Sequence, residues 1–164
     1  MTIVPSRQKV AKEEGTIVVT GKLRNGRLIV TNAIADGKTI TVVLDTGSEV
    51  SVGNDALRRR LGNAGLLKSS GAVQLESVTG DLLDGEYMFV RDLQLGEVTL
   101  ANLAVVFADA HTFRKLGLED RPALLLGMNA FRAFKKVSID FANRKLRVIL
   151  PESGSLDQVR LAGL

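Results

Sequence analysis

Short runs of alternating apolar and polar residues, separated by turn signals, make up most of this chain. Residues 16–20 are all β-branched. Asn25-Gly26 and Asp36-Gly37 each lie between apolar segments, which is a strong signal for a tight hairpin turn. The first part of the chain therefore predicts strands at 16–20, from residue 28 onward and at 40–44.

A short helix is expected after these strands. Asn54 is a suitable N-cap, because its side-chain oxygen can accept a hydrogen bond from the first helical turn. Leu57 and Leu61 lie on one helical face, and Gly62 can end the helix. Residues 62–71 show no regular pattern and are expected to form a loop.

The middle of the chain predicts a hairpin with a glycine near its tip. Val73 and Leu75 alternate with polar residues before Gly80, and a return strand runs through Tyr87 and Phe89. The remaining pattern predicts strands at 93–95, 98–100, 103–107, 137–141 and 146–150, one or two helical turns within 109–121, and a short helix at 128–134. The fold class is therefore mostly β with two or three short helices.

Length and composition suit one domain. The 164 residues can bury a sizeable core, and we place the domain at 15–151, between a flexible arm at 1–14 and a tail at 152–164. The tail is expected either to be mobile or to form one helix. Aromatic residues make up only 4% of the chain, so aliphatic side chains must fill the core. The absence of cysteine excludes disulfides and a cysteine nucleophile.

The sequence leaves the location of the protein open. No apolar run approaches the roughly 20 residues of a membrane-spanning helix, and residues 1–15 lack the apolar stretch of a secretory signal. We expect a cytoplasmic protein if this sequence is complete, and a periplasmic or membrane-anchored one if a leader has been removed.

The net charge of +4 does not by itself indicate a nucleic-acid partner. Basic residues are scattered apart from Arg58–Arg60 and the stretch 135–147, and with one tyrosine and no tryptophan there is little to stack on bases. We expect solvated surface charge and no nucleic-acid binding. Strongly salt-dependent retention on DNA would support the opposite interpretation.

Residues 42–48, Val-Val-Leu-Asp-Thr-Gly-Ser, resemble the active-site turn of aspartic proteases. Asp-Thr-Gly alone is a weak signal, but an apolar strand precedes it and a glycine-tipped hairpin follows. Residues 124–127, Leu-Leu-Leu-Gly, then lead into a second short helix, and Gly127-Met128-Asn129 is similar to the Gly-Arg-Asn of retroviral proteases. Over residues 16–150 the chain resembles retropepsin-like proteases, above all bacterial single-domain members. The resemblance implies a closed β-barrel with a flap hairpin.

This resemblance assigns a role to each residue of the turn. Asp45 would be the catalytic acid/base. Thr46 would send its hydroxyl across a dimer axis, Gly47 would let the backbone approach the carboxylates, and Ser48 would donate a hydrogen bond to Asp45. The expected substrate-binding residues are Glu49 and, on the flap, Val78, Thr79, Gly80 and Asp81.

The chain has one such motif, whereas two-domain pepsins have two. The resemblance therefore implies a homodimeric endopeptidase with its active site on the two-fold axis. The two Asp45 carboxylates would share a proton and activate a water that attacks the peptide bond. This chemistry needs no metal or other cofactor. The expected partners are a peptide or protein substrate and a second copy of the chain.

Two positions depart from the retroviral pattern. Glu49 stands where retroviral enzymes usually have an aspartate, and Met128 stands where its arginine partner would be. That salt bridge is expected to be lost or rebuilt. The departure motivates an alternative, in which the fold is a catalytically silent dimeric module for peptide binding or scaffolding. The intact Asp45 motif argues against this alternative.

Other residues with possible chemistry favour structural roles. His111 is the only histidine, so neither a zinc site nor a serine-histidine triad is expected. Asp140 lies on a predicted strand, where an exposed or capping role is expected. Gly37-Lys38-Thr39 lacks the first glycine of a phosphate-binding loop.

Overall fold

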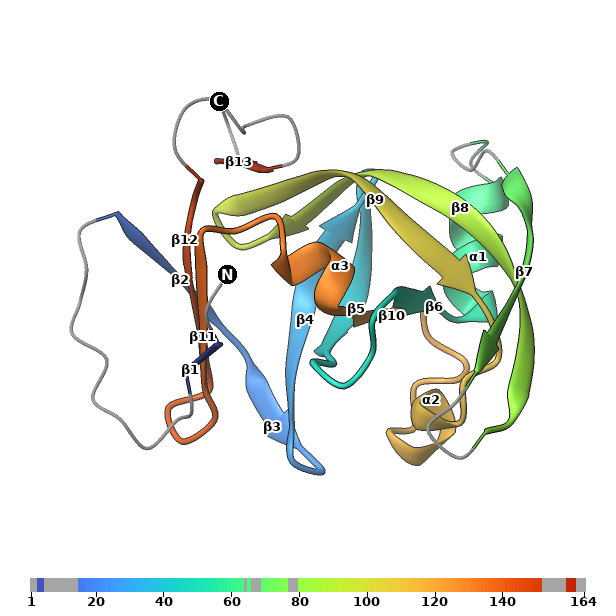
Figure 1. Ribbon diagram of the computed structural model, residues 1–164, viewed down its shortest axis with the longest axis horizontal. Helices are drawn as coiled ribbons and strands as arrows, with labels where there is room; N and C mark the ends of the chain where they lie inside the picture. The colour runs from blue at the N-terminus through green and yellow to red at the C-terminus, as the bar shows by residue number, and fades with distance from the viewer. Residues whose placement is uncertain are drawn as a thin grey trace.

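The computed structural model describes residues 3–4, 15–63, 65, 69–76, 80–151 and 159–161. The strands are β1 (Ile3–Val4), β2 (Thr16–Thr20), β3 (Lys22–Arg24), β4 (Arg27–Ala35), β5 (Lys38–Leu44), β6 (Ser51–Gly53), β7 (Ser69–Glu76), β8 (Leu82–Leu95), β9 (Val98–Phe107), β10 (Ala123–Leu126), β11 (Lys136–Asp140), β12 (Lys145–Ile149) and β13 (Val159–Leu161). The helices within these residues are α1 (Asp55–Asn63), α2 (His111–Lys115) and α3 (Met128–Phe131) (Figure 1). The mostly β class predicted from the sequence is confirmed.

The strands form two sheets. The smaller sheet has the order β1-β11-β12-β2 and lies on the opposite side of the molecule from the β7–β8 hairpin (Figure 1). The larger sheet runs β13-β9-β6-β10-β5-β4-β8-β7, with β3 paired to β4. Because β8 also pairs with β9, the pairings close on themselves through β9, β6, β10, β5, β4 and β8.

The central strands β5 and β10 are buried on both faces, which explains their nearly continuous apolar sequences. Val42 and Leu124 face the main core, while Val43 and Leu125 belong to a second cluster on the other face. Burial of each such side chain contributes about 1.5–3 kcal/mol. Two aromatic rings of the segment after β10, those of Phe131 and Phe134, complete the main core.

Both predicted hairpin turns are confirmed. Asn25 and Gly26 have φ of 48° and 74°, and Asp36 and Gly37 have φ of 46° and 81°. Two successive positive φ values are the signature of a type I′ turn, whose twist matches that of the flanking strands. The first turn sets the register of β3 against β4. The second sets β4 against β5 as far as Ala33, where a bulge shifts the pairing by one residue.

The predicted N-cap of α1 is also confirmed. The Oδ1 atom of Asn54 accepts a hydrogen bond from the N–H of Leu57 at 2.9 Å. Leu57 and Leu61 are fully buried, as their shared helical face predicted. The helix continues to Asn63, one residue past the predicted stop at Gly62.

Several boundaries differ from the sequence prediction. No strand was expected at β6, whose Ser-Val-Gly sequence is too short to show alternation; it is buried because it lies between β9 and β10. β8 and β9 are each continuous where shorter strands were expected, and β7 begins inside the predicted loop at 62–71. Helix α3 ends at Phe131, before the predicted end at residue 134.

Both ends of the chain contribute strands. Ile3–Val4, within the predicted arm, pair in parallel with β11. Val159–Leu161 pair with β9, so these tail residues are extended rather than helical. Among the described residues, α1, α2 and α3 all fall short of the length and hydrophobicity that a bilayer crossing requires.

Candidate active site

Asp45 lies at the point where β5 ends. β10 runs parallel to β5, with Leu126 beside Leu44, and the Asp45 N–H donates to the Leu126 carbonyl at 2.9 Å. The Asp45 side chain is 16% exposed. The neighbouring strand therefore fixes the backbone of Asp45, while its carboxylate remains accessible from one side.

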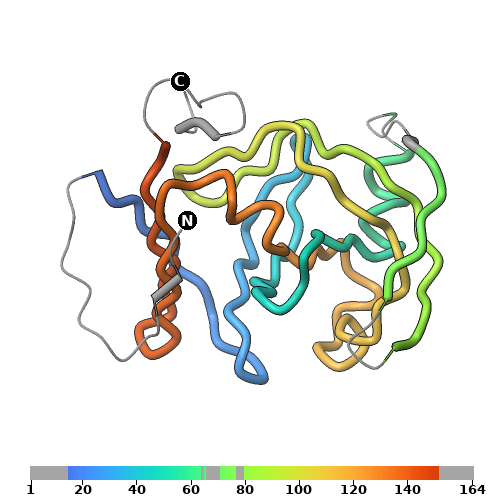
Figure 2. Tube along the Cα trace, in the orientation of Figure 1, coloured from blue at the N-terminus to red at the C-terminus, as the bar shows by residue number. Residues whose placement is uncertain are grey.

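The loop after Asp45 is held by the residues that open α3. The N–H of Met128 donates to the Ser48 carbonyl at 2.8 Å, and the N–H of Asn129 donates to the Glu49 carbonyl at 3.1 Å. In Figure 2 the loop after β5, in teal, and the segment after β10, in orange, lie side by side. The backbone of the candidate site is thus bound to a second element at successive residues.

Gly127 makes this close approach possible. A Cβ on Gly127 would lie 2.5 Å from the Val50 carbonyl carbon and 2.9 Å from the Ser48 carbonyl oxygen, both backbone atoms. Its φ of −93° is open to any residue, so the requirement for glycine is one of space. Any side chain here would displace the loop that carries Asp45.

A buried polar pair joins the same two segments. The Ser51 hydroxyl, which is completely buried, donates to Asn129 Oδ1 at 2.8 Å and accepts the Gly127 N–H at 3.0 Å. The Asn129 amide then donates to the Ala104 carbonyl on β9 at 2.9 Å. Sequence reasoning did not assign Ser51 a role. The Asn129 match to the family pattern was the signal that pointed here.

The predicted contact between Ser48 and Asp45 is wrong for this subunit. The Ser48 hydroxyl instead donates to the Val50 carbonyl at 2.7 Å, because the loop turns back toward it within two residues. The Gly47 N–H donates to Asp45 Oδ1 at 3.2 Å and orients the carboxylate. Thr46 and Gly47 are exposed, which leaves the role of Thr46 across a dimer axis as a prediction.

Arg27 is a neighbour of Asp45 that the sequence analysis missed. Its guanidinium Nη1 lies 3.2 Å from Asp45 Oδ1. Ile29 and Val43 are paired across β4 and β5, so one step further along the same face brings Arg27 opposite Asp45. A β-bulge between Val30 and Ala33 shifts the pairing by one residue from the register that the Asp36-Gly37 turn implies, so the sequence held no local signal for this contact.

The salt bridge of Glu49 is rebuilt rather than lost. Arg132 Nη2 lies 2.5 Å from Glu49 Oε2, and Arg132 follows Met128 by about one helical turn. Both side chains are largely exposed, so the pair contributes at most about 1 kcal/mol. The side chain of Met128 packs against the main core instead.

Gly80 and Asp81, two of the other predicted substrate-binding residues, lie between β7 and β8. Gly80 is exposed and has a φ of +85°, a conformation suited to glycine. Asp81 is also exposed. Val78 and Thr79 lie outside the described residues, so the contacts of these four residues with substrate stay a prediction.

The segment 109–121 packs over Val43, on part of the sheet face that Asp45 shares. It contains α2, which confirms the helical turns predicted here. Its residues Phe113, Leu116 and Leu118 are buried in the second cluster beside Val43. The Asn54 amide donates to the Leu118 carbonyl at 2.8 Å. The segment is therefore fixed to the sheet through Val43 and to the start of α1 through Asn54.

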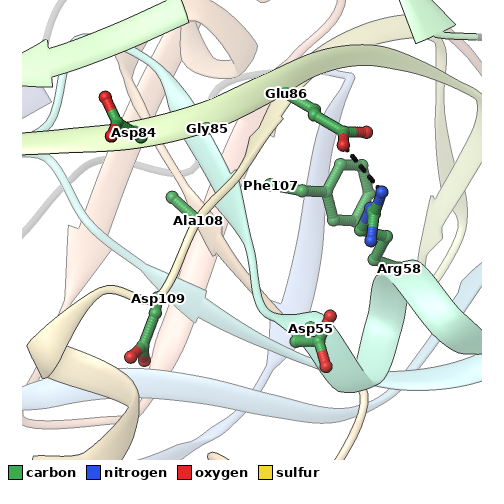
Figure 3. A pocket seen from close by; sticks show the side chains of 8 residues that line it. All are labelled: Asp55, Arg58, Asp84, Gly85, Glu86, Phe107, Ala108 and Asp109. Carbon is green, nitrogen blue, oxygen red and sulfur yellow. Dashed lines mark hydrogen bonds and ion pairs between the residues drawn. The ribbon is translucent and has the colours of Figure 1, made fainter. Parts of the chain in front are cut away.

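A cavity of about 560 Å³ lies between α1, β8 and the end of β9 (Figure 3). Its four carboxylates each have a polar partner: Glu86 with Arg58 at 2.7 Å, Asp55 with Arg59 at 3.3 Å, Asp109 with Arg114 at 2.6 Å and Asp84 with Gln74 at 3.0 Å. These contacts neutralise or satisfy the acids, so the cavity offers no unpaired group for chemistry.

Asp140 has the capping role expected for it. Hydrogen bonds from the side chain and backbone N–H of Asn143, at 2.8 and 3.0 Å, and the nearby Arg147 guanidinium lower the pKa of Asp140 from 3.8 to about 2. The carboxylate closes the turn between β11 and β12. His111 is exposed at the start of α2.

Comparisons with known proteins identify the family. A family model described as aspartyl protease matches residues 30–130, which include both Asp45 and Gly127. The solved structure of a retropepsin-like aspartic protease from Rickettsia conorii is similar, with a TM-score of 0.54 and 20% sequence identity over 82% of this chain and 89% of that one. No curated protein matches the sequence significantly. The chain therefore belongs to the aspartyl protease family and has the retropepsin-like fold.

Proposed function

We propose that this chain is an aspartic endopeptidase that works as a homodimer, with Asp45 of each subunit forming the catalytic pair. One observation carries the proposal. The parallel strands β5 and β10 end side by side, and β10 is followed by Gly127 where β5 is followed by Asp45. One subunit thus supplies one acid at this position, and the second acid has to come from another chain.

The shape of the turn supports contact between two copies. Thr46 and Gly47 are exposed, and the next two residues, Ser48 and Glu49, are hydrogen-bonded to the start of α3. A fixed, exposed turn can meet its symmetry mate without the entropic cost of ordering a mobile loop. Thr46 is the residue we expect to donate across the two-fold axis.

In the proposed dimer the two Asp45 carboxylates hold one proton between them, because like charges so close cannot both ionise. The deprotonated member takes a proton from a bound water as its oxygen attacks the scissile carbonyl carbon. The protonated member donates to the developing oxyanion. Collapse of this intermediate breaks the carbon–nitrogen bond, and a proton from the pair passes to the leaving amine. Neither a covalent intermediate nor a metal is required.

We propose that peptide binds between this turn and the β7–β8 hairpin. Closure of a hairpin over a bound peptide excludes water from the reacting centre. Gly80 and Asp81 lie between β7 and β8, and we expect them to contact the peptide together with Val78 and Thr79. Glu49 is exposed beside Asp45 and held by Arg132, so it is placed to contact the peptide backbone.

Arg27 favours the second candidate function, a silent peptide-binding module. In the single subunit its guanidinium pairs with the acid that catalysis needs. In the proposed enzyme Arg27 has to leave Asp45 when two carboxylates come together around one proton. If the ion pair persists in the dimer, the fold is a binding module and Asp45 is a structural anion.

Cleavage of an unbiased peptide mixture tests the proposal. The wild type and Asp45→Asn are compared between about pH 4 and pH 7, a range that spans carboxyl and histidine titration, with the oligomeric state measured alongside. We expect the wild type to cleave and the variant dimer to lose turnover by orders of magnitude. Equal cleavage by both would move the catalytic acid elsewhere. No cleavage by wild-type dimers would favour the binding module.

A further inference from the structure

A second cavity, which we name the basic pocket, has a volume of about 300 Å³. It lies where β3, the start of β4 and the middle of β5 meet the end of the segment 109–121. Its lining residues are Lys22, Leu23, Arg24, Ile29, Thr31, Thr41, Leu118 and Arg121. The lining therefore combines three cations, two hydroxyls and an apolar floor, with no carboxylate.

The three cations of the basic pocket keep their positive charge among the residues that the structure describes. Within the described part of the chain, none of Lys22, Arg24 and Arg121 forms an ion pair, and Arg24 donates to the Leu116 carbonyl at 2.9 Å. The cavity of Figure 3 differs, because its arginine is already paired with a glutamate. Cations gathered around a concavity attract anions, and guanidinium groups suit carboxylates in particular.

The basic pocket lies on the same face of the sheet as Asp45. Thr41, Val43 and Asp45 alternate along β5, so their side chains share one face. Ile29, which lines the pocket, pairs with Val43. At about 3.3 Å per residue, the four residues from Asp45 to Thr41 span roughly 13 Å. An extended peptide covers the same distance in about four residues.

The floor of the basic pocket suits a side chain rather than a free ion. Ile29 and Leu118 are buried members of the second cluster. They offer an apolar surface to the methylene carbons of a bound residue, while the cations at the rim meet its charged end. Glutamate has this combination of a short apolar stem and a terminal carboxylate.

We infer that the basic pocket is a specificity subsite, which binds an acidic side chain of the substrate about four residues from the cleaved bond. This inference rests on the proposed function, because it names the class of substrate for that site. The enzyme therefore prefers peptides with glutamate or aspartate at that distance over otherwise identical peptides with glutamine.

The variants are chosen to change charge without disturbing the fold. Lys22→Gln and Arg121→Gln remove exposed cations, and the Arg121 carbonyl that accepts the Asn54 amide is unaffected. Arg24 is retained because it holds the Leu116 carbonyl. Arg60→Gln is the matched control, since Arg60 is an exposed cation on α1 outside the pocket.

The first measurement uses a peptide that the wild type cleaves, with glutamate or glutamine placed three to five positions from the cut on either side. We expect glutamate to raise kcat/KM about three- to tenfold, an effect that weakens with salt. The preference should persist in Arg60→Gln and vanish when Lys22→Gln and Arg121→Gln are combined. Equal cleavage of both peptides by the wild type, or a preference that survives the double variant, would overturn the inference.

A second measurement separates this inference from the proposed function. The unbiased peptide mixture is passed over immobilised Asp45→Asn protein, with and without the two pocket substitutions. Enrichment of acidic peptides that depends on Lys22 and Arg121 supports the subsite even if no peptide is ever cleaved. Cleavage without such enrichment supports the protease and rejects the subsite.

Discussion

The turns after β5 and β10 start from the same architecture and serve different purposes. Both strands are buried on both faces, run parallel in register, and lead to a glycine-containing turn. The turn after β5 carries Asp45 and is exposed at Thr46, whereas the turn after β10 carries Gly127 and is buried. The difference indicates a division of labour, in which one turn presents the acid and the other holds it in place.

The largest expected effect comes from Gly127→Ala, which makes the turn after β10 collide with the loop that carries Asp45. The new Cβ meets backbone atoms of Ser48 and Val50 that cannot rotate away. We expect a loss of about 1–3 kcal/mol in the free energy of unfolding. A shift of the loop by about 1 Å should cost roughly 100-fold in activity. Denaturant titration and peptide cleavage measure the two effects.

Gly62→Ala is the matched control for this variant. Gly62 lies in α1, and a Cβ there meets nothing within 4 Å. Alanine should stabilise the helix by about 0.5–1 kcal/mol and leave activity unchanged. If a folded Gly127→Ala protein kept wild-type activity, the proposed support of the loop by this turn would be wrong.

Ser51→Ala removes the side-chain hydrogen bonds that join β6 to the turn after β10, and it keeps the backbone bonds from Met128 and Asn129 to the loop after Asp45. The substitution leaves the Gly127 N–H and Asn129 Oδ1 buried with one partner fewer. We expect destabilisation by about 1–3 kcal/mol. At a temperature well below the melting temperature, where both variants are folded, Ser51→Ala should lose less activity than Gly127→Ala. A drop in activity as large as that of the glycine variant would mean that the hydroxyl acts directly in the site.

Arg27→Gln tests whether the ion pair between Arg27 and Asp45 opposes dimerisation. The ion pair with Asp45 is partly exposed and contributes at most about 1 kcal/mol to the single subunit. Because the proposed dimer has to break one such pair in each subunit, about 2 kcal/mol at most in total, the substitution should tighten dimerisation by up to about 30-fold. Sedimentation at graded concentrations measures this, with the exposed Arg91→Gln as control. Weaker dimers would instead place Arg27 in a favourable contact across the interface.

The smallest expected effect on the site comes from Asp140→Asn, far from both turns. The pKa of Asp140 is about 2 in the folded state, below its ordinary value of 3.8. The Asp140 carboxylate therefore adds stability above pH 3.8, and this stability is lost as pH falls toward 2. The stability difference between wild type and variant should therefore be constant from about pH 4 to pH 7 and shrink below. Activity in that range should be equal in both. A difference that varied between pH 4 and 7 would contradict the assignment.

Local signals in the sequence were enough to predict the turns and the acid. The Asn-Gly and Asp-Gly dipeptides predicted the hairpin turns, and Asn54 predicted the start of α1. The Asp45 motif predicted the position of the candidate site. Each depends on residues close together in the chain. The strand β6 escaped because burial between two other strands, rather than its own pattern, makes it a strand.

Contacts between distant segments were the part that the sequence did not show. Arg27 meets Asp45 through strand register, Arg132 replaces an arginine expected one turn earlier, and Ser48 turns to Val50 instead of Asp45. The basic pocket likewise collects Lys22 and Arg121 from segments far apart in the chain. Side-chain reach and register decide such contacts, and neither has a local signature.

Activity of mixed dimers tests the central claim that each subunit supplies one aspartate. Wild-type and Asp45→Asn chains are mixed at fixed total concentration, allowed to exchange, and assayed on a cleaved peptide. If both acids are needed, activity falls as the square of the wild-type fraction, to about one quarter in an equal mixture. A linear fall, to about one half, would show that each chain works with its own Asp45 alone and would contradict the shared active site.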